Sequence, residues 1–431
     1  MAESDRTFRA PRGTRDLLPP ESWSWEYLRN FALAGVFGYA GYEPIEIPVF
    51  EHTEVFERGV GSTSEVVTKQ MYTFQDLGGR SLTLRPEVTA SVMRAVLEHG
   101  LHRGPLPVKL SFAGPMFRQE RPQKGRHRQF LQIDIEAIGS DDPRVDAEVI
   151  ELGVRYLKEV GIEASLMLNS IGHPDESCRR GYLALLVDFL KKRVDDLAPD
   201  DRARIDTNPL RTFDSKEAKT VAVMRDAPVI TDHLCDACRK HFESVRELLG
   251  ELGVGFELEP RLVRGLDYYT RTAFEFVAEG LGAQNAVGGG GRYDGLSESL
   301  GGPPLPAIGF ALGVDRILMA LAVPARAPRP PVEVYVVALG EEAQRAALSV
   351  ATELRRDGFP CQLDLMGRGM KGQMKDADRT GARWAAIIGE DELAAGEVTL
   401  KDLRSGEQQR VARSQIIPTV MRVYQEESGT S

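Results

Sequence analysis

The most regular alternation of apolar and polar residues lies between Gly114 and Gly139. In its second half two sets of side chains take opposite parity: the apolar Leu131, Ile133 and Ile135, and the polar Gln132, Asp134 and Glu136. This is the period of a β-strand whose two faces meet different surroundings. We therefore predict two strands joined by a loop, with the polar face of the second strand turned toward a cavity.

Helical and strand periods also mark the chain on either side of this hairpin. Before it, we predict a helix at 21–38, a strand at 42–51 closed by a proline, a hairpin at 71–85 turned at two glycines, and a helix after Pro86. After it, we predict a helix at 141–162, a mainly helical region at 173–257, an aromatic-rich strand at 261–280, a glycine-rich stretch at 282–302, and a strand leading into a helix at 307–321.

A proline-rich linker at 323–331 is the clearest domain boundary in the chain. Strands and helices alternate beyond it, so residues 332–425 predict a separate α/β unit, followed by a short tail at 426–431. The preceding domain spans residues 1–322.

Composition narrows the class of protein. The chain has 431 residues, of which 42% are hydrophobic and 27% charged, which is typical of a globular protein with more than one domain. It contains no apolar run of the roughly 20 residues that a bilayer requires, and its charged start does not resemble a signal peptide. Four cysteines indicate no disulfide framework, so we expect a cytoplasmic protein without membrane contact.

Charge is distributed unevenly along the chain. The net charge of −10 argues against a protein that coats nucleic acid nonspecifically. The loop of the central hairpin, however, holds one acid, Glu120, among five cations: Arg118, Arg121, Lys124, Arg126 and Arg128. Such a loop repels itself unless an anion binds there. We therefore expect an anionic ligand at this loop.

The sequence of this loop resembles a known family signature. FRQERPQKGRHRQFLQ, residues 117–132, is similar to motif 2 of the class II aminoacyl-tRNA synthetases in the form found in histidyl-tRNA synthetases. The helix and strand before it resemble motif 1, and AIGFALGVDRILMAL at 307–321 resembles motif 3, with Asp315 where the family more often has glutamate. LRPEVT at 84–89 and RGLDYYTRTAFE at 264–275 resemble stretches peculiar to histidyl-tRNA synthetases.

The resemblance implies an α+β fold: an antiparallel sheet flanked by helices with a helical insertion at 173–257, followed by an anticodon-binding domain at 332–425. It implies activation of L-histidine by ATP and Mg²⁺ to histidyl-adenylate, then transfer to tRNA(His). It also implies a homodimer, because motif 1 forms the dimer interface in the class. Magnesium would enter with ATP, and no metal is expected to belong to the protein itself.

The resemblance also assigns residues to roles. Catalysis falls to Arg118 and Arg264, which are expected at the histidine carboxylate and the ATP α-phosphate. The remaining histidine contacts are expected from Glu87, Thr89, Gln132, Glu136, Tyr268 and Tyr269, with Glu136 and Tyr269 at the imidazole. The other ATP contacts are expected from Glu120, Arg126 and Arg316. The basic residues Arg368, Lys371, Lys375 and Arg379 are expected to contact tRNA.

Strict strand alternation would send Arg264 and Tyr269 to opposite faces. Both can reach one site only if the backbone breaks its period near Gly265, and we predict such a break.

Two other functions fit a fold of this kind. A regulatory subunit of the phosphoribosyltransferase that opens histidine biosynthesis would resemble this chain, but such paralogues typically lack the C-terminal domain and lose the catalytic arginines. A non-catalytic tRNA sensor would have no reason to keep Arg118, Arg264 and Arg316 together. Each of these features is present here, which favours the enzyme.

A cysteine pair stands in the helical region. Cys235 and Cys238 have the two-residue spacing of a zinc site, and His233 and His241 flank them. All four lie in one short segment that we expect to be helical, which cannot easily surround a metal tetrahedrally. We therefore expect these residues to bind no structural zinc.

Overall fold

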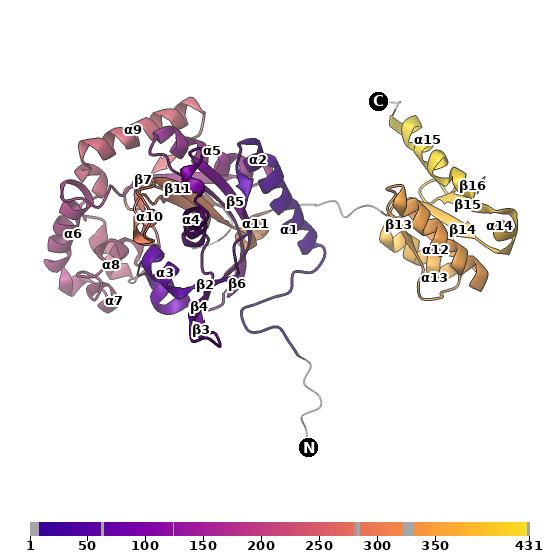
Figure 1. Ribbon diagram of the computed structural model, residues 1–431, viewed down its shortest axis with the longest axis horizontal. Coiled ribbons are helices and arrows are strands. Elements are labelled where there is room, and N and C mark those ends of the chain that lie inside the picture. The colour runs from indigo at the N-terminus through magenta and orange to yellow at the C-terminus, as the bar shows by residue number, and fades with distance from the viewer. Residues whose placement is uncertain are drawn as a thin grey trace, which may run out of the picture. The chain divides into compact units, whose positions relative to one another are not determined.

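The computed structural model describes residues 8–61, 64–123, 125–279, 281, 285–321 and 332–428. The chain divides into two compact units, Met1–Ala327 and Pro328–Ser431 (Figure 1). The predicted linker at 323–331 lies outside the described residues. Among the described helices, none is both long and apolar enough to cross a membrane.

The first unit is built on an eight-stranded sheet. Its strands run in the order β1 (Glu43–Pro44), β5 (Val108–Phe117), β6 (Gln129–Ile138), β11 (Ala307–Gly313), β10 (Ala286–Arg292), β9 (Thr270–Ala278), β7 (Ala164–Ser170) and β8 (Glu257–Leu258). The pairs at the two ends, β1 with β5 and β7 with β8, are parallel, and the pairs between them are antiparallel. The predicted central hairpin is confirmed as β5 and β6.

Helices cover one face of this sheet. The long α5 (Pro143–Glu159) packs against β11 and against α9 (Asp236–Glu251). It also contacts η1 (Phe31–Val36), which lies in the chain between α1 (Glu21–Asn30) and α2 (Phe37–Tyr39). Ile133 and Ile135 of β6 are fully buried in this layer. Each such side chain contributes about 1.5–3 kcal/mol by leaving water. The opposite face of β6 is therefore available for polar groups.

A buried ionic cluster ties the sheet to these helices. Arg292, at the end of β10, is fully buried and donates from Nη2 to Asp146 of α5 at 2.6 Å. His241 of α9 contacts the same carboxylate at 3.1 Å. Removing one partner from a buried pair leaves an uncompensated charge and typically costs about 3–5 kcal/mol. Arg292 and His241 therefore contribute to the fold through their contacts with Asp146.

A small three-stranded sheet with adjoining helices completes the N-terminal half. It contains β2 (Phe50–His52), β4 (Ser81–Leu84) and β3 (Tyr72–Gln75), and its neighbours are α3 (Thr53–Val60), η2 (Val66–Gln70), α4 (Thr89–Glu98) and η3 (Leu101–Arg103). The predicted hairpin at 71–85 is confirmed. The single strand predicted at 42–51 is wrong, because its two ends pair in different sheets. Pro44 and Pro48 lack the N–H that a continuous ladder requires.

Residues 176–251 are mainly helical, as predicted. The elements are η4 (Glu176–Arg180), α6 (Gly181–Lys191), η5 (Val194–Asp196), α7 (Pro199–Arg202), η6 (Pro209–Asp214), α8 (Ala218–Met224), η7 (Ile230–His233) and α9. Helices α6, α7 and α8 gather beside the sheet in Figure 1. Residues of α6 and α8 share a separate apolar cluster with Tyr269 and Ala273 of the sheet side. This cluster connects the helical region to the start of β9.

The second unit has a five-stranded mixed sheet. Its strands run β13 (Cys361–Leu363), β12 (Val334–Ala338), β14 (Trp384–Ile388), β15 (Glu397–Asp402) and β16 (Gln408–Ala412), with the first three parallel. Its helices are α12 (Glu341–Arg356), α13 (Met370–Thr380), α14 (Glu390–Ala395), η8 (Arg413–Gln415) and α15 (Ile416–Ser428). Part of the predicted tail, 426–428, belongs to α15, and 429–431 lie outside the described residues. The predicted α+β class is confirmed.

Candidate active site

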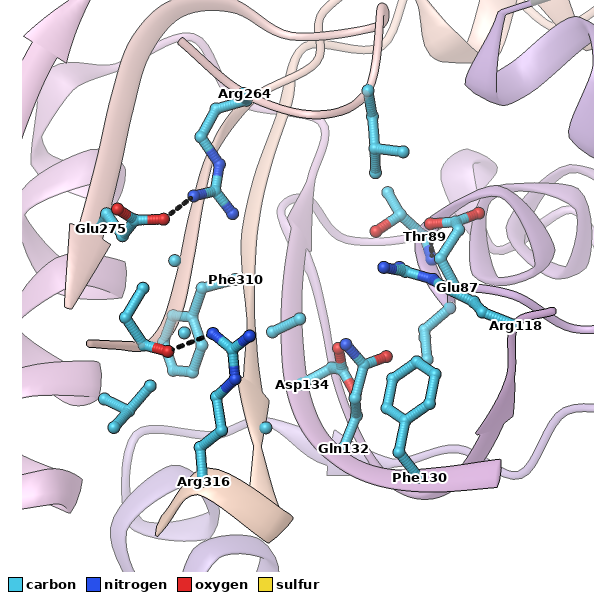
Figure 2. Close-up of a pocket in the computed structure, with 18 of the residues that line it drawn as sticks. Glu87, Thr89, Arg118, Phe130, Gln132, Asp134, Arg264, Glu275, Phe310 and Arg316 are labelled. Atoms are coloured by element: carbon cyan, nitrogen blue, oxygen red, sulfur yellow. Dashed lines mark hydrogen bonds and ion pairs between the residues drawn. The ribbon is translucent and has the colours of Figure 1, made fainter. Parts of the chain in front are cut away.

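A pocket with a cavity of about 290 Å³ opens on the polar side of β6. Gln132 and Asp134 point into it, whereas Ile133 and Ile135 face the core (Figure 2). The predicted division of this strand into two faces is therefore confirmed. Gln132 Oε1 and Asp134 Oδ2 are buried without a hydrogen-bond partner among the described residues. Orphaned acceptors in a cavity are typical of a site that a ligand completes.

Glu87 and Thr89 form one wall at the start of α4. The Glu87 carboxylate accepts the backbone N–H groups of Thr89 at 2.8 Å and Ala90 at 2.9 Å. It therefore caps the helix while also lining the pocket. Burial raises the pKa of Glu87.

Glu136 lies behind this wall, since it does not line the pocket itself. The Thr89 hydroxyl donates to its Oε1 at 2.6 Å, and the Tyr293 hydroxyl donates to its Oε2. A Cβ on Gly309 would lie 1.8 Å from the same carboxylate, so glycine is required there. Burial raises the pKa of Glu136 to about 8. The expected direct contact with imidazole stays a prediction, and Tyr293 is a neighbour that the sequence analysis missed.

Three arginines reach the pocket from separate segments. Arg118, just after β5, donates from Nε to the Pro86 carbonyl at 2.9 Å. Arg264 donates from Nη1 to Glu275 Oε1 at 2.9 Å, and Arg316 of α11 (Val314–Ala320) donates from Nη1 to the Ala286 carbonyl at 2.5 Å. Figure 2 shows Arg264 and Arg316 on one side of the pocket and Arg118 on the other. All three arginines line the same cavity, and their roles stay predictions.

These contacts orient each guanidinium group before a ligand arrives. Arg264 is mostly buried and its Nε has no partner among the described residues. Burial lowers the pKa of Arg316, and the neighbouring charge of Arg126 lowers it further. Like charges held together in a partly desolvated cavity strongly favour an anion between them.

Arg264 and Tyr269 both line the pocket, as predicted. The strand predicted at 261–280 is too long, because β9 begins only at Thr270 and the preceding residues form a loop. This loop provides the break in period that both side chains need. It also brings the Tyr268 hydroxyl within 3.4 Å of Glu87 Oε2. The aromatic rings of Tyr268 and Tyr269 lie 4.7 Å apart.

The loop of the central hairpin lines another side of the pocket. Glu120 and Arg126 both line the pocket, where Arg126 Nη1 lies 3.1 Å from Glu120 Oε2. Lys124 lies outside the described residues. Without ligand, the two predicted ATP contacts therefore neutralise each other.

The N-terminal arm contacts both this loop and α11, which the sequence analysis missed. In the loop, the backbone N–H of Arg128 donates to the Gly13 carbonyl at 2.6 Å. Arg15 donates to Asp315 Oδ1 at 2.8 Å and also to both carboxylate oxygens of Glu21. Asp315 Oδ2 accepts the backbone N–H of Leu131 at 3.3 Å. The only signal in the sequence was Asp315, an acid in the first turn of α11 (Val314–Ala320). Its partners are too distant in the chain for a local pattern to reveal.

Glycines of β10 let neighbouring strands approach closely. A Cβ on Gly290 would lie 2.0 Å from the Gly309 carbonyl oxygen, and one on Gly289 would lie 2.9 Å from Arg264 Nη1. These glycines therefore leave room for the neighbouring strands and for Arg264. Arg292, which follows the run, points instead to the buried Asp146.

The predicted tRNA contacts lie on or beside α13 in the second unit. Arg368, Lys371, Lys375 and Arg379 are all exposed. Asp376 pairs with Arg368 at 3.0 Å and with Arg379 at 2.5 Å. The two lysines, one helical turn apart, have no ion pair with a described residue and carry most of the uncompensated charge.

An antiparallel sheet that carries three arginines at a polar cavity, followed by a separate mixed α/β unit, is the architecture expected of a class II aminoacyl-tRNA synthetase. Comparison with known proteins gives the family. Residues 13–176 and 190–317 match the family model described as histidyl-tRNA synthetase, and residues 333–422 match the anticodon binding domain. The chain therefore belongs to the histidyl-tRNA synthetase family, and its activity is the ATP-dependent ligation of histidine to tRNA.

Individual relatives agree over nearly the whole chain. The histidine–tRNA ligase of Halothermothrix orenii is 48% identical over 418 residues, covering 96% of this chain and 99% of that protein. The histidine–tRNA ligase of Corynebacterium kroppenstedtii is 50% identical and covers 96% of this chain and 97% of that protein. The crystal structure of apo histidyl-tRNA synthetase from S. aureus matches with a TM-score of 0.80 and 35% identity, covering 96% of this chain and 100% of that chain.

Proposed function

We propose that this pocket holds histidine and ATP side by side and joins the histidine carboxylate to the α-phosphate. A carboxylate oxygen forms the new bond to phosphorus while the bond to the leaving pyrophosphate breaks, which gives histidyl-adenylate. A ribose hydroxyl at the 3′ end of tRNA(His) then attacks the histidyl carbonyl carbon and loses its proton, and AMP leaves. The observation that carries the proposal is the convergence of Arg118, Arg264 and Arg316 on one cavity.

The histidine half is assigned to the wall formed by β6 and the start of α4. Glu87, Thr89 and the orphaned oxygen of Gln132 supply acceptors for the ammonium group. Tyr268 and Tyr269 enclose the side chain. Glu136 lies behind Thr89 and contributes to the specificity for imidazole indirectly, because its carboxylate fixes the hydroxyls of Thr89 and Tyr293. Buried polar groups that only one ligand satisfies discriminate strongly against its analogues.

The phosphate half is assigned to the arginines. Arg118 and Arg264 face each other across the pocket and would neutralise the charge that builds up on the α-phosphate. Arg316 and Arg126 lie toward the outer phosphates, with Glu120 releasing Arg126 when ATP enters. Glu120 and Glu275 also line the pocket and offer the carboxylate oxygens that Mg²⁺ prefers. Magnesium bound with ATP would neutralise the pyrophosphate as it leaves.

The second unit is assigned to tRNA(His) through Lys371 and Lys375. Their charge is exposed and uncompensated, as backbone phosphate binding requires. A reaction that consumes ATP and tRNA is placed in the cytoplasm, where both are available.

A homodimer is proposed from an exposed apolar surface on the small sheet. Phe50 of β2 and Phe74 of β3 are 53% and 43% exposed, and their rings lie 6.5 Å apart. Leu77 in the adjoining turn is fully exposed. Sedimentation should show a dimer, and Phe50→Glu should shift it toward monomer. A monomeric wild-type protein at micromolar concentration would contradict this assignment.

The alternative is a regulatory subunit that keeps the fold without the chemistry. Histidine-dependent exchange of pyrophosphate into ATP separates the two, because only an enzyme forms the adenylate reversibly. We expect exchange with histidine and none with other amino acids. Histidine binding in calorimetry without any exchange would instead support the regulatory role.

A further inference from the structure

Four side chains with metal-binding atoms meet at the base of the helical region. They are His173, Cys178, Cys235 and Cys238, and their ligand atoms all lie within 4.8 Å of one another. His173 Nδ1 lies 3.0 Å from Cys238 Sγ and 3.7 Å from Cys235 Sγ. A tetrahedral zinc ion with Zn–S near 2.3 Å and Zn–N near 2.0–2.1 Å spaces its ligand atoms by roughly 3.5–3.8 Å. The cluster is therefore close to the required size.

The ligands come from two separated segments. Cys235 caps α9 and accepts the Cys238 backbone N–H, whereas His173 and Cys178 follow β7. The premise of the sequence analysis, that all candidate ligands lie within 233–241, is wrong. His233 packs on the ring of Tyr182 instead. Paired ligands from separate segments are the usual arrangement of a structural zinc site.

The surroundings suit a closed metal site. His173 Nε2 lies 2.8 Å from Asp175 Oδ2, which leaves Nδ1 directed at the thiols. A carboxylate on the second ring nitrogen is the usual orienting partner of a metal-bound histidine. Cys178 and Cys238 are only 2% and 1% exposed. Arg179 interacts electrostatically with both thiols, and its charge would offset the net −1 of three thiolates on Zn²⁺.

We propose that His173, Cys178, Cys235 and Cys238 bind one structural Zn²⁺. The ion would fasten residues 173–178 to the start of α9. It would also steady the histidine pocket, because Arg179, next to Cys178, donates from Nη1 to the Tyr269 carbonyl at 2.7 Å. The site is independent of the proposed catalytic roles. It takes the place of the expectation that the protein binds no metal of its own.

The direct test is the metal content of full-length protein purified without added zinc or chelator. We expect about one equivalent of zinc per chain. Cys235→Ser and Cys238→Ser should each reduce it. Two variants serve as matched controls: Cys361→Ser removes a buried thiol of the second unit, and His233→Asn removes the neighbouring histidine outside the cluster. Both controls should keep their zinc.

A second measurement does not depend on the folding of any variant. Co²⁺ added to reduced, metal-depleted wild-type protein should give the visible absorption of tetrahedral thiolate coordination. Zinc below about one tenth of an equivalent together with no cobalt spectrum would overturn the proposal. So would a disulfide between cluster cysteines in freshly purified protein, or full zinc content in the Cys235→Ser, Cys238→Ser double variant.

Activity is measured separately. Removal of the metal should raise the histidine KM severalfold and leave the ATP KM nearly unchanged. Unchanged histidine KM in zinc-free protein would remove the link to Tyr269. A zinc-loaded protein without pyrophosphate exchange would refute the proposed chemistry and leave the metal site standing, so the two failures are distinguishable.

Discussion

The arginines of the pocket and the lysines of α13 differ in how firmly neighbouring groups hold them. Arg118, Arg264 and Arg316 are each held by a carbonyl or carboxylate at 2.5–2.9 Å before any ligand binds. Lys371 and Lys375 are exposed and have no ion pair with a described residue. The first group fixes geometry, and the second supplies charge without fixed geometry.

This difference determines how each group responds to change. Fixed donors in a partly dry cavity act on the transition state, so removing one typically costs about 3–4 kcal/mol. Exposed charges are screened over about 10 Å at 0.1 M salt and act additively. We therefore expect steep, local losses in the pocket and graded, salt-dependent losses on α13.

The largest effect should follow from separating the two regions. A chain that ends after residue 327 keeps every residue assigned to adenylate formation and loses the whole second unit. Pyrophosphate exchange should stay within a few fold of wild type, while tRNA charging falls by about a thousandfold or more, because the phosphate contacts are lost. Parallel loss of both activities would show that the second unit supports the pocket.

Arg264→Ala tests a fixed donor. Histidine-dependent pyrophosphate exchange should fall by about a few hundredfold, with the fold and oligomeric state unchanged. Arg261→Ala is a suitable control, because Arg261 lies in the same loop, its guanidinium donates to the backbone carbonyls of Met224 and Arg225, and it is not among the described residues that line the pocket. Exchange near the wild-type rate in Arg264→Ala would remove Arg264 from catalysis.

Lys371→Glu with Lys375→Glu tests the exposed charges. Affinity for tRNA should fall about tenfold to a hundredfold at low salt, and the log–log salt slope should shrink by about one unit for each lost phosphate contact. Arg345→Glu, on the exposed side of α12, should change neither quantity. An unchanged salt slope in the double variant would place the tRNA elsewhere.

Glu136→Gln should give the smallest effect. The histidine KM should rise by about tenfold with little change in the ATP KM, because the amide keeps the size of the side chain but has only one acceptor oxygen for the hydroxyls of Thr89 and Tyr293. Equal changes in both constants would make Glu136 a scaffold residue.

The same variant should flatten the pH dependence of stability. Burial raises the pKa of Glu136 from 4.5 to about 8, so the folded protein retains a proton that the unfolded chain releases between these values. The resulting stabilisation is full below about pH 4.5 and is lost as the pH rises through about 8. The difference in unfolding free energy between wild type and Glu136→Gln should fall with pH, by at most about 1.4 kcal/mol per unit. A constant difference would contradict the raised pKa.

The sequence predicts features that depend on neighbouring residues, and it does not predict contacts between residues that are far apart in the chain. The faces of β6 depend on neighbouring residues, so the period of the strand predicts them. The break before Tyr269 was inferred instead from the roles that the resemblance assigns to Arg264 and Tyr269. The pairing of Arg264 with Glu275 and the burial of Arg292 depend on strand register. The joining of His173 to Cys238 spans 65 residues. No local pattern carries such contacts, because they are set by how whole elements pack.

The ion pair between Arg15 and Asp315 also determines when this contact can form during synthesis of the chain. The two residues are 300 positions apart. A ribosome that adds about 5–20 residues per second needs roughly 15–60 s to cover that distance. The N-terminal arm must therefore wait on the nascent chain for its partner. Arg316 emerges immediately after Asp315, so the unfinished polypeptide lacks part of the pocket lining until almost the entire first unit has been made.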